Sequence, residues 1–186
     1  MGLIHLPQLI FERNEETDRH DTDYTFGYFG DYHSYVRNIW PFYEACKSTR
    51  TKTYIIGNTD NYLEATDTIE VRNRVSLSEL KVFQDKTDVL VHLSNLRGGQ
   101  IPGKIYHYSS TNKPILFILD GTDEEKEIIY NYFKKYNRYI FCNNDVYSIV
   151  SKINGIKKIK NEELKKESVT EFTPKAVVER LITDLE

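Results

Sequence analysis

The fold of this chain is decided by residues 89–119, which read VLVHLSNLRGGQIPGKIYHYSSTNKPILFIL. The apolar runs at the two ends, Val89–Leu93 and Ile115–Leu119, are nearly continuous, as is typical of strands covered on both faces of a sheet. Between them lies a glycine-bearing loop, followed by a helix that we expect to begin just after Pro102. A strand, a crossover with a helix and a second strand form a βαβ unit, so both strands are predicted to be central and parallel.

Short β-rich runs on either side of this unit extend the same pattern. They alternate with longer amphipathic segments and cover residues 25–29, 53–56, 68–71 and 139–141. Ser76 and Thr122 are each followed three residues later by a glutamate, the pattern of a capping box at a helix start. The chain is therefore predicted to have an α/β fold, a Rossmann-like three-layer α/β/α sandwich around a mostly parallel sheet.

The last predicted helix begins at Thr173–Pro174, where a hydroxyl can cap the helix and a proline lacks only an N–H that the first turn does not need. Its apolar side chains recur on one face, at Val177, Val178, Leu181, Ile182 and Leu185. We expect this face to pack on the rest of the domain, so that removing residues 173–186 would lower stability or solubility.

Length and composition fit one folded domain. The chain has 186 residues, of which 39% are hydrophobic, and we expect a domain at residues 24–186 behind a polar connector at residues 1–23. Acidic and histidine side chains gather in this connector, but without the spacing of metal ligands on a regular element. A solvated loop is therefore favoured over a metal site for Asp18, His20, Asp21 and Asp23.

Charge and cysteine content argue against several classes of protein. The chain has 25 basic and 28 acidic residues and a pI near 6.0, which gives no electrostatic basis for binding nucleic acid. Cys46 and Cys142 are far apart in the sequence, so neither a disulfide framework nor a zinc site is indicated and a reducing cytoplasm fits best. No apolar run reaches the roughly 20 residues of a membrane helix, and neither secretion nor membrane spanning is expected.

The loop between the two central strands is the candidate anion site. Gly98, Gly99 and Gly103 allow the backbone to approach a phosphate at the carboxyl end of a parallel strand, where a helix start adds a positive dipole. Lys104 then falls in the first turn of the helix, a position that disfavours a cation unless an anion is bound. The same residues also suit a flexible loop with a solvent-exposed lysine, and neither a Walker A nor a GxGxxG motif is present.

A wider series of motifs resembles a known family. In order along the chain, these motifs are FGYFG at 26–30, RNIWPFYEA at 37–45, YIIG at 54–57, RNRVSLSEL at 72–80, TDVLV at 87–91, PGKIYHY at 102–108 and KPIL at 113–116. The series is similar to the C-terminal, donor-binding half of GT-B glycosyltransferases, most of all those that resemble family 4. The resemblance extends from about Tyr24 to Leu185, and it is carried by the order of the motifs rather than by any one of them.

The resemblance implies donor-binding roles for residues in several loops. Gly30 would border the donor diphosphate, with Arg37 as a phosphate ligand, and the segment of Asn73 and Arg74 would read the nucleotide base. Arg74 could also be a surface residue at a helix start. The remaining residues match the strand end, loop and helix that hold the sugar and diphosphate: Ser94, Gly98, Gly99, Gln100, Gly103, Lys104 and His107.

One departure from the family concerns a pair of glutamates separated by seven residues, the second of which binds the donor ribose. Gly99 and His107 occupy those positions here. His107 could bind a ribose hydroxyl through a ring nitrogen or could pack between its neighbours. His92, inside an apolar strand, is expected to be a core histidine with its hydrogen bonds satisfied, and no catalytic residue is identified.

The implied function is the donor half of a hexosyltransferase that moves a sugar from a nucleoside diphosphate to an acceptor in surface polysaccharide or glycoconjugate synthesis. Helix-end amides, Lys104 and Arg37 would stabilise the leaving group, without a metal or other cofactor. An N-terminal acceptor-binding domain is the expected partner, and the whole enzyme would be cytoplasmic, either free or peripherally attached to the inner face of the membrane. Two alternatives stay open: a non-catalytic nucleotide-binding or partner-docking module, and an epimerase-like domain, for which no acid–base pair is evident.

Overall fold

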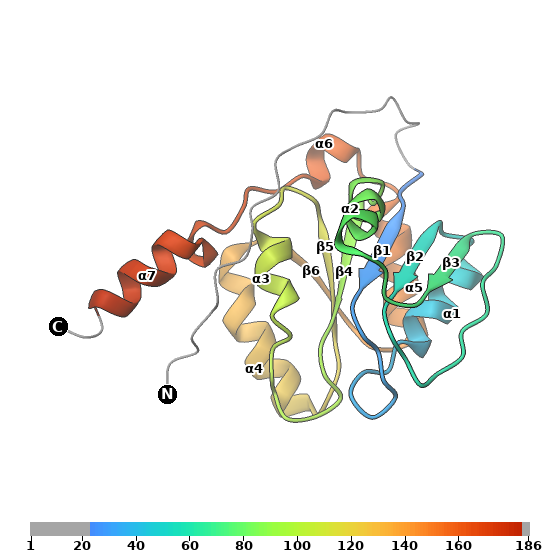
Figure 1. Cartoon of the computed structure of the whole chain (residues 1–186), viewed down its shortest axis with the longest axis horizontal. Helices are drawn as coiled ribbons and strands as arrows, with labels where there is room; N and C mark the ends of the chain where they lie inside the picture. Colours follow the sequence, from blue (N-terminus) through green and yellow to red (C-terminus); the bar gives the residue numbers. More distant parts are fainter. Residues whose placement is uncertain (1–22, 184–186) are drawn as a thin grey trace.

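The structure is a computed structural model, and it describes residues 23–183. The predicted connector lies outside the described residues except for Asp23, as do residues 184–186. Six parallel strands form one sheet in the order β3-β2-β1-β4-β5-β6 (Figure 1). Their bounds are β1 Phe26–Phe29, β2 Thr53–Ile56, β3 Ile69–Arg72, β4 Val89–Leu93, β5 Ile115–Leu119 and β6 Tyr139–Asn143.

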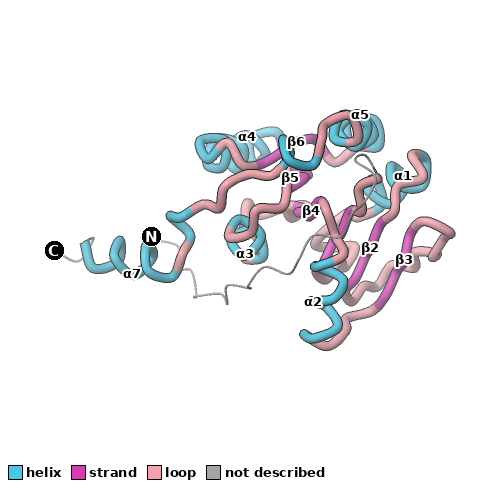
Figure 2. Tube along the Cα trace, turned by 90° about the horizontal axis from the view of Figure 1, so that it is seen from above, coloured by secondary structure: helices cyan, strands magenta, loops and turns pink. Residues whose placement is uncertain are grey.

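Helices cover both faces of the sheet and confirm the predicted α/β/α sandwich. One face packs against α1 (Trp40–Ser48) and α5 (Val146–Ile156). The other packs against α2 (Leu77–Asp85), α3 (Lys104–Ser109) and α4 (Asp123–Phe133), as the view from above shows (Figure 2). Four further elements complete the description: η1 Lys134–Tyr136, α6 Asn161–Leu164, η2 Thr170–Phe172 and α7 Pro174–Thr183.

Successive side chains of the central strands point to opposite faces of the sheet and so form two cores. In β5, Leu116 and Ile118 point to the face of α1 and α5, whereas Ile115, Phe117 and Leu119 point to the opposite face. All five residues of this strand are buried. This two-sided burial explains the continuous apolar runs from which the central position of β4 and β5 was predicted.

The two predicted capping boxes differ in the structure. At Thr122, the hydroxyl accepts from Glu125 N at 3.2 Å and the Glu125 carboxylate accepts from Thr122 N at 2.8 Å, so this box is complete. At Ser76, the hydroxyl accepts from Glu79 N at 3.3 Å, but the Glu79 carboxylate accepts from Arg72 Nη1 at 3.0 Å instead of returning to the cap. The prediction of a reciprocal box at Ser76 is therefore wrong, because an arginine at the end of β3 competes for the glutamate.

The prediction that the last helix packs on the domain is also wrong for the described residues. Both views place α7 apart from the sheet and its covering helices, beyond η2 (Figures 1 and 2). Val178 and Ile182 are exposed on α7. The cap at its start does form, since Thr173 Oγ1 accepts from Ala176 N at 3.3 Å. Within residues 23–183, none of the helices combines the length and the apolar character needed to cross a membrane.

Candidate functional site

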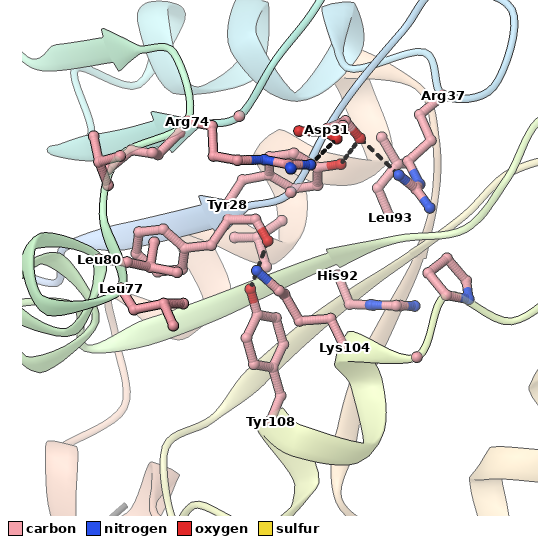
Figure 3. Close-up of a pocket in the computed structure, with 18 residues that line it drawn as sticks. Tyr28, Asp31, Arg37, Arg74, Leu77, Leu80, His92, Leu93, Lys104 and Tyr108 are labelled. Atoms are coloured by element: carbon pink, nitrogen blue, oxygen red, sulfur yellow. Dashed lines mark hydrogen bonds and ion pairs between the residues drawn. The ribbon is translucent and has the colours of Figure 1, made fainter. Parts of the chain in front are cut away.

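A cleft of about 430 Å³ opens at the carboxyl edge of the sheet, where β1 and β4 lie side by side. The chain continues from β1 to β2 on one side, whereas β4 leads to β5 on the other, so the strand order reverses at this point. In open parallel sheets such a switch point is the usual place for a ligand. The loops after β1, β2, β3 and β4 and the start of α3 form the walls of this first cleft (Figure 3).

Two glycines let the loops after β1 and β2 meet at the rim of the cleft. Gly30 N donates to Ile56 O at 2.9 Å. A Cβ on Gly57 would lie 1.9 Å from the Gly30 carbonyl oxygen, a distance that no side chain tolerates. The close contact of these two backbone segments places the next residue, Asp31, against the end of β2.

Asp31 connects the loops around the first cleft. Its carboxylate forms an ion pair with Arg74 and accepts from Asn58 N at 2.9 Å. Its backbone carbonyl accepts from Arg37 Nη1 at 2.6 Å and from Tyr28 Oη at 3.1 Å. Figure 3 shows the two arginines reaching Asp31 from opposite sides. One residue directly after β1 thus fixes both arginines at the mouth of the cleft.

The charges in the first cleft do not balance. Arg37, Arg74 and Lys104 line it, and among residues 23–183 Asp31 is the single carboxylate in its lining. Burial lowers the pKa of Lys104 to about 8; Asp31 opposes this shift, whereas Arg74 and Arg37 increase it. A cleft with three cations and one carboxylate is suited to an anion, which would relieve the repulsion that the cations exert on one another.

His92 contributes a neutral imidazole to the same cleft. The side chain is 3% exposed, its ring lies 4.6 Å from the Phe117 ring, and burial lowers its pKa to about 3, with Arg37 and Lys104 adding to the shift. Nε2 is buried without a hydrogen-bond partner in the described part of the chain. The prediction of a core histidine is confirmed for its burial, but the prediction that its hydrogen bonds are satisfied is wrong.

The structure brings five of the predicted site residues together in the first cleft: Gly30, Arg37, Arg74, Gly103 and Lys104. Ser94 is buried behind it, where its hydroxyl accepts from Asp120 N at 2.6 Å and joins the ends of β4 and β5. This hydroxyl therefore has a structural role in the sheet.

The glycine loop turns away from the first cleft. Gly98 and Gly99 have φ of +87° and +58°, and Gly98 N donates to Glu125 Oε1 at 2.7 Å, at the start of α4. A side-chain carboxylate of this protein thus holds an amide that was expected to hold the donor phosphate. Three further predicted residues also lie outside the lining of the cleft: Asn73, Gln100 and His107.

Several residues of the first cleft were not predicted from the sequence. Asp31 is foremost among them, and its position directly after a strand and a glycine is a signal that could have identified it. Tyr28 and Tyr108 also line the cleft, and burial raises the pKa of the Tyr28 hydroxyl to about 12, so this hydroxyl stays protonated as a donor. Tyr108 Oη donates to Phe29 O at 3.4 Å.

Comparisons with known proteins do not assign this site. No protein-family model matches the sequence, and a search of curated proteins found no match either. The geometry of the cleft therefore carries the functional argument.

Proposed function

We propose that this chain is the donor-binding domain of a glycosyltransferase and that the first cleft holds the diphosphate of a nucleoside-diphosphate sugar. One observation supports the proposal above the others: three cations surround one carboxylate at the switch point of a Rossmann-type sheet. A diphosphate carries enough negative charge to offset this excess. The resemblance of the motif order to the GT-B donor-binding half supports a nucleotide sugar in particular.

The two sides of the first cleft fit the two parts of a nucleotide. Lys104 supplies a compact ammonium for the phosphates, and Arg37 and Arg74 supply guanidinium groups that can donate two hydrogen bonds each. Apolar side chains of Ile56, Val75 and Leu80 line the cleft beside Arg74 and suit a base or ribose. In the transfer reaction these cations would stabilise the negative charge that develops on the leaving diphosphate. An acceptor would be held by a second domain facing this edge of the sheet.

Calorimetry on the Lys104→Ala variant tests the proposal. A charge-assisted contact contributes roughly 1.5–3 kcal/mol, so the variant should bind UDP, GDP or ADP, whichever the wild type prefers, about ten-fold or more weakly. The corresponding nucleoside, which has no phosphate, should bind both proteins equally.

Lys175→Ala is the matched control. Lys175 also lies in the first turn of a helix but is 84% exposed on α7, away from the first cleft. It should leave diphosphate affinity unchanged. Wild-type protein that binds none of the three diphosphates, or a Lys104→Ala variant that binds them as the wild type does, would contradict the proposal.

A further inference from the structure

A second cleft of about 400 Å³ adjoins the first. Arg37 lines both, so a ligand anchored by phosphate in the first cleft could extend into the second. The second cleft lies between the loop after β1, the loop after β2 and Leu96 of the loop after β4. Of the donor-binding residues that the family resemblance implies, Arg37 alone lines it.

Hydrogen bonds between these three loops shape the second cleft in advance. Leu96 N donates to Val36 O at 2.8 Å and connects the loops after β4 and β1. Ser34 donates to the Asp60 carboxylate through both its backbone N and its hydroxyl, at 2.6 Å each, and connects the loops after β1 and β2. A cleft whose walls are already joined requires little ordering when it binds a ligand.

The lining combines one large aromatic ring with small polar groups and buried apolar side chains. Trp40 is 51% exposed, and its ring lies 5.5 Å from that of Tyr43. The backbone N of Trp40 donates to Asn38 Oδ1 at 3.3 Å, and the Asn38 carbonyl accepts from Asn144 Nδ2 at 2.8 Å. Asn61 and the buried Leu63, both from the loop after β2, also line the cleft.

This combination suits a sugar ring. A pyranose presents an apolar face of C–H groups, which packs on an aromatic ring, and an equatorial rim of hydroxyls, which amides and hydroxyls can bind. We propose that the second cleft binds a pyranose of a carbohydrate, with its C–H face on Trp40 and its hydroxyls toward Asn38, Asn61 and Ser34. The sugar is either that of the donor or the terminal sugar of an acceptor glycan, and the donor case rests on the proposed function.

Trp40 is the only tryptophan of the chain, so tryptophan fluorescence reports on this cleft directly. The wild type is titrated with UDP-glucose, UDP-galactose, UDP-N-acetylglucosamine and GDP-mannose, each against UDP or GDP, and with free maltotriose, mannotriose and chitotriose. A larger change with a nucleotide sugar than with its diphosphate identifies the donor sugar. A change with a free trisaccharide identifies an acceptor glycan.

Variants then separate stacking from damage to the fold, with affinities measured by calorimetry. Trp40→Ala should weaken the sugar-bearing ligand about three- to ten-fold and leave the matching diphosphate unchanged, and Trp40→Phe should weaken it less. Tyr147→Ala removes another exposed ring, 84% exposed on the first turn of α5 and outside both clefts, and should change neither affinity.

The two proposals fail in different ways. If no diphosphate binds the wild type, the proposed function fails, and the free trisaccharides still decide whether the second cleft is a sugar site. If diphosphates bind but no sugar alters Trp40 fluorescence, or if Trp40→Ala binds every ligand as the wild type does, the second cleft is not a sugar site.

Discussion

At the scale of single residues, Lys104 makes ligand binding depend on pH. Because its pKa is lowered to about 8, the Lys104 ammonium of the ligand-free protein loses its proton as pH rises through that value. A diphosphate, already ionised above about pH 7, binds the protonated form better. We expect affinity for the diphosphate to fall as pH rises from about 7 to about 9 and to approach the affinity of the Lys104→Ala variant once the amine is neutral.

Calorimetry across this range measures the effect, and Lys104→Arg is the control. An arginine keeps its charge at every pH in the series, so the variant should show a much flatter profile. A wild-type profile as flat as that of the arginine variant would mean that Lys104 does not face the diphosphate.

At the scale of elements, Gly57 decides whether the ends of β1 and β2 can meet. A Cβ there would lie 1.9 Å from the carbonyl oxygen of Gly30, which is backbone and has no alternative rotamer. Gly57→Ala should therefore force the two loops apart and destabilise the domain by about 1–3 kcal/mol or more, measured by urea unfolding. It should also weaken diphosphate binding, because Asp31 and its arginines move with the loop.

Gly155→Ala is the matched control for that substitution. Gly155 lies within α5, and a Cβ there would meet nothing within 4 Å. Alanine should leave stability unchanged or raise it by up to about 1 kcal/mol, since it favours the helix. Equal effects of the two substitutions would show that the contact between Gly57 and Gly30 does not limit stability.

At the scale of the whole molecule, the position of α7 predicts that the domain does not depend on it. Removing residues 174–186 should change the melting temperature by less than about 2 °C and leave diphosphate affinity intact, because α7 lies apart from both cores. Calorimetric unfolding of the shortened chain measures this. A drop of several degrees would show that the helix packs on the domain.

A deletion that begins earlier provides the contrast. Removing residues 170–186 also takes away Phe172, whose ring lies 4.9 Å from the rings of both Tyr106 and Tyr136. This loss of aromatic packing should lower the melting temperature by several degrees.

Secondary structure and fold class were determined by the sequence itself. Each strand could be predicted from a β-rich run of a few residues. The continuous apolar runs of β4 and β5 indicated a sheet covered on both faces, which the structure confirms. The position of Lys104 at a helix start was equally local and is confirmed. Such features are readable because periodicity and capping depend on neighbours within about two turns.

Only the tertiary structure decided which loops meet. Asp31 and Arg74 form an ion pair across 43 positions, and Gly98 reaches Glu125 across 27, so strand order rather than local pattern sets these contacts. The same holds for Glu79, whose carboxylate binds Arg72 instead of the backbone at the start of α2. It also holds for α7, because the apolar pattern of a helix does not predict which surface, if any, the helix packs on. A sequence motif determines the secondary structure of its own segment, whereas the charge and shape of a site arise from separate segments that the sheet brings together.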